Sequence, residues 1–338
     1  RHKNIEYKKD TPMTHLSRLL LTGSAALAFA LSACQSEATK SEPLAGDLSK
    51  EQLVEMMQGA MADAKATSGS GAPAMWTFSD KDTTVNILGT VHLLKPDVVW
   101  KSPAITEALA QADTLVLEAD TTSPESQAGI QRLMMEYASY NDGGSLTATL
   151  NDEDEALVAA ALAEKNIPLQ AVDPLKPWMV SLQLGMMQIM EAGYDPQSGV
   201  EMKLLAEAGD KKISYLETVE TQIKMLGGAP IDEQVQGLMA SLGTIDLGEE
   251  YLDALVAEWA DGDVEGIGVM VANPAMLGSQ EAYDALFTTR NRNWVPNIKA
   301  LLEEPGNKLV AVGAGHLAGP DSVIKMLKDE GIQVKPVK

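Results

Sequence analysis

Two histidines occupy the same place in a repeated sequence pattern. His92 lies in GTVHLLKPDVV and His316 lies in GAGHLAGPDSV, so both fit G-x-x-H-L-x-x-P-D-x-V. Imidazole is the commonest metal ligand and the usual acid–base group near neutral pH. The other histidines, His2 and His15, fall in an N-terminal segment that we assign to targeting, which leaves this pair as the candidates for chemistry. The structural alternative is that each histidine only hydrogen-bonds a turn at a strand end.

Two carboxylates also follow apolar runs. Glu118 ends TLVLE, and Glu217 follows ISYL. Two imidazoles and one carboxylate can hold a divalent cation, leave a position for water and lower the pKa of that water. We therefore predict His92, His316 and Glu118 as metal ligands, and Glu217 as general base or further ligand. The alternatives are a solvent-facing strand end for Glu118 and a helix N-terminal carboxylate for Glu217.

One cationic candidate, Arg290, lies in TTRNRNW on a predicted helix. A guanidinium near the site could stabilise an oxyanion or clamp a substrate carboxylate. The alternative is a salt bridge of the kind expected in an acidic protein.

The elements that must position these residues can be predicted from periodicity. We expect strands at 75–79, 84–88, 114–118, 213–216, 309–312 and 332–336, helices at 48–66, 103–111 and 321–330, and mainly helix from 124 to 305. Each histidine motif follows an apolar strand, and open α/β sheets place ligand sites at the carboxyl ends of strands. The predicted fold is α/β (α+β), with a mixed central sheet built from two repeat-related strand–GxxH–helix units and a large helical insertion.

Composition limits the classes of function. The chain has 338 residues, 45% hydrophobic and 22% charged, which is globular. Its formal charge of −22 disfavours nucleic acid as a partner. A single cysteine excludes an intrachain disulfide and Cys-based zinc or iron–sulfur sites. There is no H-E-x-x-H, G-x-S-x-G, P-loop or G-x-G-x-x-G, which disfavours zincins, α/β-hydrolases and P-loop NTPases.

The N-terminal segment has the order of a secretory signal peptide. Its apolar run, 19–30, is shorter than the roughly 20 residues that span a bilayer, and LSAC ends at Cys34 as in a bacterial lipobox. We expect lipidation of Cys34 and a membrane anchor in the cell envelope, facing the periplasm, with Gln35 favouring the outer membrane. The predicted organisation is upstream or non-native sequence at 1–12, signal peptide at 13–33, lipidated tether and helix at 34–74, and the main domain at 75–338.

The ordered motifs resemble the TraB/GumN family, within a superfamily that includes the Tiki proteases, the erythromycin esterases and the haem-binding ChaN lipoproteins. The likeness covers residues 75–337. It rests on LGTVHL at 88–93, DTLVLEAD at 113–120, GVE-x-x-LL at 199–205, YLET-V-E-x-Q at 215–222, RNRNW at 290–294 and VAVGAGHLAGPDSV at 310–323.

The resemblance implies a peptidase-like, divalent-metal-dependent hydrolase, because the Tiki branch uses paired G-x-x-H motifs and a glutamate. His92, His316 and Glu118 would hold manganese, cobalt or zinc, with Glu217 and Arg290 as further catalytic carry-overs. The family often has Asp where this chain has Glu201, and we place Glu201 outside the core site. The alternatives are a non-catalytic haem or metal carrier, by resemblance to ChaN, or a structural envelope factor. A homodimer is compatible with the repeat, and the peptide or small-molecule substrate stays open.

Overall fold

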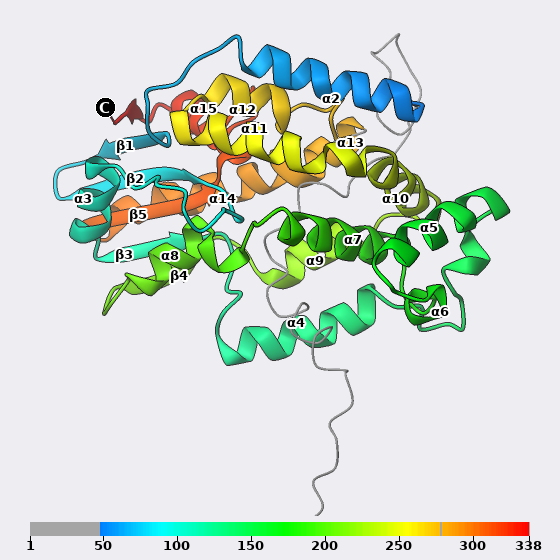
Figure 1. Cartoon of the computed structure of the whole chain (residues 1–338). Helices are drawn as coiled ribbons and strands as arrows, with labels where there is room; N and C mark the ends of the chain where they lie inside the picture. Colours follow the sequence, from blue (N-terminus) through cyan, green and yellow to red (C-terminus); the bar gives the residue numbers. More distant parts are fainter. Residues whose placement is uncertain (1–47, 278, 338) are drawn as a thin grey trace, which may run out of the picture.

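A mixed sheet organises the computed structural model, which describes residues 48–277 and 279–337 (Figure 1). Its strands are β1 Met75–Ser79, β2 Thr83–Thr90, β3 Thr114–Leu117, β4 Lys212–Tyr215, β5 Gly306–Gly313 and β6 Lys335–Pro336. Within the described ranges these six strands lie in the order β4-β3-β5-β2-β1-β6. The four neighbours β4, β3, β5 and β2 are parallel, while β1 pairs antiparallel with both β2 and β6. The predicted α/β fold with a mixed sheet is confirmed.

The two strands that precede the histidine motifs are direct neighbours. β2 and β5 pair in parallel along their whole length, with Gly89 opposite Val312 and Thr90 opposite Gly313. Parallel partners end at the same edge of a sheet, so the two G-x-x-H stretches leave the sheet side by side. β5 also pairs with β3, which places the last long strand of the chain in the middle of the sheet.

Side-chain alternation along the strands builds two cores. Leu115, Leu309 and Ala311 belong to one buried cluster, and Val116 and Val310 belong to the other. Successive residues of a strand point to opposite faces, so each cluster covers one face. The first cluster includes residues of α3 Pro103–Gln111, α8 Val200–Ala206, α11 Gly248–Asp261 and α12 Val264–Met270. The second includes residues of α14 Thr289–Ala300 and α15 Val323–Asp329.

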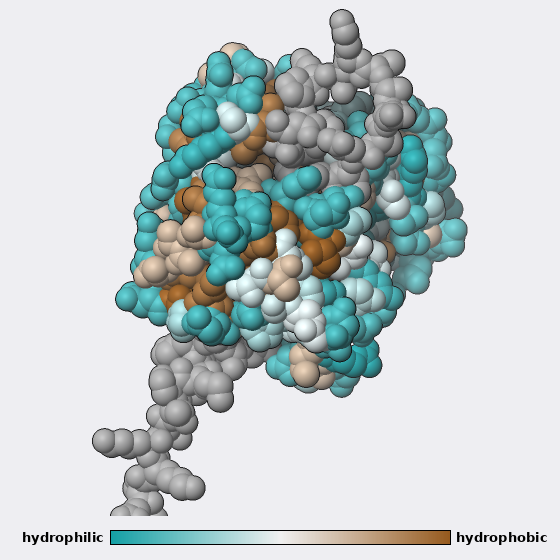
Figure 2. All heavy atoms as spheres, turned by 90° about the vertical axis from the view of Figure 1, so that its right-hand side faces the viewer, coloured by the Kyte–Doolittle hydropathy of each residue, from teal (hydrophilic) through white to brown (hydrophobic). Residues whose placement is uncertain are grey.

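The segment between β3 and β5 is mainly helical, as predicted, with β4 inside it. Its remaining α-helices in the described ranges are α4 Pro124–Tyr137, α5 Asp152–Glu164, α6 Leu169–Val172, α7 Pro177–Glu191, α9 Val219–Gly227, α10 Ile231–Thr244 and α13 Gln280–Tyr283. A separate apolar cluster joins α5, α7 and α10 through Val158, Leu184 and Leu238. Figure 2 shows that, on the side where Figure 1 draws these three helices, hydrophobic residues form a band between hydrophilic margins.

The helix α2 Lys50–Ala64 forms where the sequence predicts one. Ser49 caps it: the Ser49 hydroxyl accepts from the Gln52 backbone, and the Gln52 side chain accepts from the Ser49 backbone. This reciprocal pair satisfies two N–H groups that a helix start leaves open. The helix packs against α10 and α12, and its buried side chains include Met57 and Met61. The predicted signal segment and Cys34 lie outside the described residues.

None of the described helices is both long enough and apolar enough to cross a bilayer.

Candidate active site

The predicted site residues follow the carboxyl ends of four neighbouring parallel strands. Glu118 comes directly after β3, Glu217 follows β4, His92 follows β2 and His316 follows β5. Parallel strands deliver their carboxyl ends to one edge, so residues far apart in sequence converge there. Arg290 reaches the same place from α14. One chain therefore supplies all five side chains.

Arg290 bridges the two predicted carboxylates. Its Nη2 donates to Glu118 Oε2 at 2.7 Å and to Glu217 Oε1 at 2.6 Å. The three side chains are between 6% and 9% exposed. Burial of charges is costly unless they are paired and hydrogen-bonded, and this group meets both conditions. With one guanidinium and two carboxylates, the group keeps one uncompensated negative charge.

The guanidinium has no N–H group left for another partner. Nε donates to Glu217, Nη1 donates to the Leu286 carbonyl and to His316 Nε2, and Nη2 donates to Glu118 and Glu217. These contacts use all five donors of the side chain. Arg290 was predicted to stabilise an oxyanion or clamp a substrate carboxylate, but its donors point to protein groups. This arrangement favours a positioning role for Arg290.

The helix that carries Arg290 contributes two more partners. Asn291 Oδ1 lies 2.6 Å from His316 Nδ1, and Trp294 Nε1 donates to Glu217 Oε2 at 3.1 Å. The Trp294 ring also lies under the Arg290 guanidinium, 4.8 Å from its carbon to the ring centroid. A π-helical turn, Asp284–Thr288, leads directly into α14. Such turns are frequent at functional sites.

His316 is held as a neutral imidazole. Because Arg290 can only donate, His316 Nε2 accepts its N–H at 2.9 Å, and Nδ1 carries the proton that is donated to Asn291 Oδ1. Burial and the Arg290 charge lower the pKa of His316 well below its ordinary value. The lone pair that a metal would need on His316 is therefore engaged.

His92 forms the second charged pair of the site. Its Nδ1 lies 2.9 Å from Glu201 Oε1, and the Thr90 hydroxyl donates to the same oxygen. Burial disfavours the imidazolium, but the Glu201 carboxylate outweighs burial and raises the pKa of His92 to about 9. Glu201, which the sequence analysis leaves outside the core site, lies beside His92 because α8 directs its carboxylate onto the ring.

Two glycines permit this close assembly. A Cβ on Gly199, just before α8, would lie 2.1 Å from the His92 carbonyl oxygen, so only glycine lets α8 come so near. A Cβ on Gly313 would lie 3.2 Å from Glu118 Oε1 and 3.7 Å from His92 Nε2. The missing side chain leaves a small space that faces both a carboxylate oxygen and an imidazole nitrogen. The Gly313 backbone N–H donates to Glu118 Oε1 at 2.7 Å.

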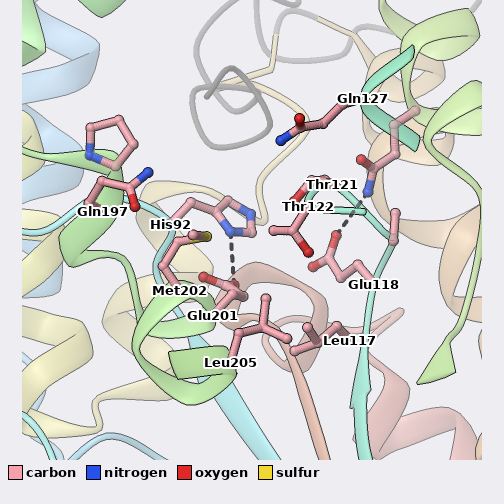
Figure 3. Close-up of a pocket in the computed structure, with 13 residues that line it drawn as sticks. His92, Leu117, Glu118, Thr121, Thr122, Gln127, Gln197, Glu201, Met202 and Leu205 are labelled. Carbon is pink, nitrogen blue, oxygen red and sulfur yellow. Dashed lines mark hydrogen bonds and ion pairs between the residues drawn. The ribbon is translucent and has the colours of Figure 1, made fainter. Parts of the chain in front are cut away.

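A cavity of about 350 Å³ opens in front of these groups. Figure 3 shows His92 and Glu201 joined on one side of it and Glu118 on the other. Among the described residues, its lining includes these three but not Arg290. The cavity lining is His92, Leu117, Glu118, Ala119, Thr121, Thr122, Gln127, Pro196, Gln197, Glu201, Met202, Leu205 and Gln222. Glu118 and the His92–Glu201 pair are thus the charged groups of the lining that can touch a ligand.

The ionisation of Glu118 suits its position in the cavity wall. Burial would raise the pKa of its carboxyl, but the Arg290 guanidinium outweighs burial and lowers the pKa to about 2. The carboxylate is also held by Gln222, whose Nε2 donates to Glu118 Oε2 at 3.3 Å and to Glu217 Oε1 at 2.9 Å. Glu118 therefore faces the cavity as a fixed anion.

Sequence reasoning missed four residues of this assembly: Glu201, Gln222, Asn291 and Trp294. All four fall inside the stretches GVE-x-x-LL, YLET-V-E-x-Q and RNRNW that carry the family resemblance. These stretches could have indicated the four residues. The expectation that ligand sites lie at the carboxyl ends of strands, however, selects only residues that directly follow a strand. These four lie on helices, and their reach depends on how those helices pack.

The predicted metal ligands fit a cation only in part. His92 Nε2 and Glu118 Oε1 border the space at Gly313, and the excess negative charge suits a cation there. His316 would have to lose Arg290 before it could bind. Within the described ranges no three His, Cys, Asp or Glu side chains already converge as a metal site. The three-ligand set stays a prediction.

Comparison with known proteins places the chain among similar sequences. The model of the TraB/PrgY/gumN family matches residues 74–336. "Uncharacterized protein YbaP" of Escherichia coli (strain K12) is 24% identical over 245 residues, which cover 72% of this chain and 87% of that protein. An uncharacterized protein of Treponema pallidum (strain Nichols) is 23% identical over 269 residues, 75% of this chain and 79% of its own length. No solved structure matches the chain.

Replacing the carboxylate behind His92 should change its titration. Burial lowers the pKa of His92, and in Glu201→Gln the carboxylate that outweighs this effect is absent. The pKa of His92 should therefore fall from about 9 to about 6.5 or below. A raised pKa adds stability that is complete below pH ~6.5 and lost as pH rises through about 9, and the variant should lose this contribution. The measurement is an NMR titration of the metal-free chain, with the signal assigned by its loss in His92→Ala. Glu207→Gln, just after α8, is the control, and a midpoint that stays near 9 in Glu201→Gln would contradict the assignment.

Removing the central cation should destabilise the fold in a pH-dependent way. Arg290→Met leaves two buried carboxylates without their partner, at a cost of about 3–5 kcal/mol near neutral pH. In the unsubstituted chain, the low pKa of Glu118 contributes stability above pH ~4.5. This contribution is lost as pH falls towards 2. In the variant that pKa rises, so stability should improve from pH 8 to pH 5.

Urea unfolding at both pH values measures this change. Arg292→Met is the matched control, because Arg292 is exposed on the same helix. An equal and small effect of both substitutions would show that Arg290 does not hold the carboxylates.

Proposed function

This chain belongs to the TraB/PrgY/gumN family, and we propose that it is a hydrolase whose active centre is the cavity between His92 and Glu118. The supporting observation is a histidine–carboxylate pair that faces a second, ionised carboxylate across a cavity of about 350 Å³. Such groups serve acid–base and metal-assisted hydrolysis. The substrate class is a peptide or other amide bond.

The hydrolase is proposed to use a divalent metal, with manganese, cobalt and zinc as candidates. His92, after losing its imidazolium proton, and Glu118 would hold it. Glu201 on Nδ1 keeps the His92 ring oriented, which is the usual arrangement behind a metal-binding histidine. The chemistry that such a metal supplies is a water of lowered pKa and a polarised carbonyl group.

Proton transfer and positioning are assigned to side chains of the protein. Hydrolysis forms a bond from a water oxygen to the carbonyl carbon, breaks the C–N bond and transfers a proton to the leaving nitrogen. Glu201 lines the cavity, and its contacts with Thr90 and His92 both use Oε1, so Oε2 is the oxygen assigned to accept the proton of water. Arg290 and Gln222 keep Glu118 ionised and fixed. Glu217 and His316 act on Arg290 from behind the wall.

Metal content and hydrolysis test this proposal together. The full chain is equilibrated with Mn²⁺, Co²⁺ or Zn²⁺, freed of excess metal, and incubated with a peptide library in ¹⁸O water. We expect about one metal per unsubstituted chain and one ¹⁸O atom in each new carboxyl terminus. Both signals should fall more than tenfold in His92→Ala and Glu118→Gln.

The control is Glu125→Gln, an exposed carboxylate in the first turn of α4. It should retain metal and activity. Unchanged metal content and cleavage in His92→Ala would refute the site. A haem absorbance band lost in His92→Ala, without cleavage, would instead favour the carrier alternative.

We also propose that the protein is anchored to the envelope membrane, facing the periplasm, by acylation of Cys34. The proposal rests on the lipobox-like end of the N-terminal segment. In a bacterial host, the protein should incorporate labelled palmitate and sediment with the outer membrane. Cys34→Ser should abolish both, while Ser36→Ala should change neither; label retained by Cys34→Ser would rule out this anchor.

A further inference from the structure

No side chain of the cavity lining offers a cation that is free to receive an anionic substrate. Among the described residues that line it, the charged ones are His92, Glu118 and Glu201, and none is Lys or Arg. His92 already pairs with Glu201 at 2.9 Å. The nearby guanidinium of Arg290 donates every N–H to a protein acceptor. The proposed metal would act on water and on the carbonyl group, so a carboxylate or phosphate elsewhere in the cavity would meet Glu118 without a compensating side chain, which is costly in a partly buried site.

One side of the cavity is apolar. Met202 and Leu205 lie three residues apart on α8, so they share a helix face, and both are partly exposed. Leu117 at the end of β3 also lines the cavity, and Figure 3 shows it beside Leu205. The same short helix supplies Glu201, the partner of His92. The apolar surface is thus tied to the position of the imidazole.

Most of the remaining lining is polar but neutral. Gln127 of α4, Gln197 before α8, and Thr121 and Thr122 after β3 all line the cavity. Figure 3 shows Gln127 and Gln197 on opposite sides of it, with the two threonines between. Amide and hydroxyl groups both donate and accept hydrogen bonds, which matches the alternating N–H and C=O groups of a peptide chain.

We infer that the cavity recognises an uncharged stretch of peptide with an apolar side chain over Met202 and Leu205, and not a free C-terminal carboxylate. This inference deepens the proposed hydrolase by naming its substrate class. The volume of about 350 Å³ lies within the range of small-ligand sites. Cleavage would fall at an internal or blocked amide bond.

Four synthetic peptides test the inference on the full chain. All are N-acetylated Ala-Ala-X-Ala-Ala, with X as Leu or Glu and the C-terminus as amide or free acid. Titration calorimetry gives Kd, and mass spectrometry gives kcat/KM in the presence of Mn²⁺. We expect the Leu amide to bind and react at least tenfold better than the Glu amide, and better than its own free acid.

A positive charge placed on the apolar side of the cavity should reverse the preference between the Leu and Glu peptides. Leu205→Lys puts an ammonium group where the side chain of X is expected, so the Glu peptide should gain at least tenfold relative to the Leu peptide. Met202→Lys is the second variant, in case Leu205→Lys fails to fold by circular dichroism. Met135→Lys is the matched control, because Met135 is 73% exposed on α4 and does not line the cavity.

The outcomes separate this inference from the proposed function. Selective binding of the Leu amide without cleavage would refute the hydrolase and support the inference. Cleavage with no preference, with preference for Glu or the free acid, or with a preference unchanged in both lysine variants would overturn the inference alone. Binding of none of the four peptides would also overturn it.

Discussion

The buried pairing of Arg290 with Glu118 and Glu217 is the interaction on which the arrangement of the site depends. Burying both side chains at under a tenth exposure would be costly without the guanidinium that pairs with them. The guanidinium in turn needs acceptors in fixed directions, and β3, β4 and β5 deliver them from three adjacent strand ends. The sheet and α14 are therefore locked together through one side chain.

This arrangement divides the site into a front and a back. Glu118 and the His92–Glu201 pair face the cavity, whereas His316, Glu217 and Arg290 stand behind Glu118. The two histidines of the repeat thus have different surroundings. His92 pairs with a carboxylate and has a raised pKa, while His316 accepts from a guanidinium and has a lowered one. Similar motifs on neighbouring strands have become chemically unequal.

Much of the fold and of the site could be predicted from the sequence, for a physical reason. Apolar runs that end in a polar residue mark strand ends, and parallel strand ends meet at one edge, so Glu118, Glu217 and both histidines converge as expected. The partners on helices could not be predicted in this way. Glu201 depends on how closely α8 approaches at Gly199, and the role of Arg290 depends on counting its donors in three dimensions. Neither distance nor donor count can be seen in a one-dimensional pattern.

The central position of β5 in the sheet has a consequence for the order in which the fold forms. Residues Gly306–Gly313 pair with β3 on one side and β2 on the other, about 200 positions earlier in the chain. Contacts across such separations form late and slowly, because a long loop must close first. While the chain is being synthesised, β2 and β3 lack the strand that separates them, and His316 has not yet emerged. The candidate site is therefore incomplete until the C-terminal segment pairs in the middle of the sheet, because β5 joins β2 to β3 and leads to His316.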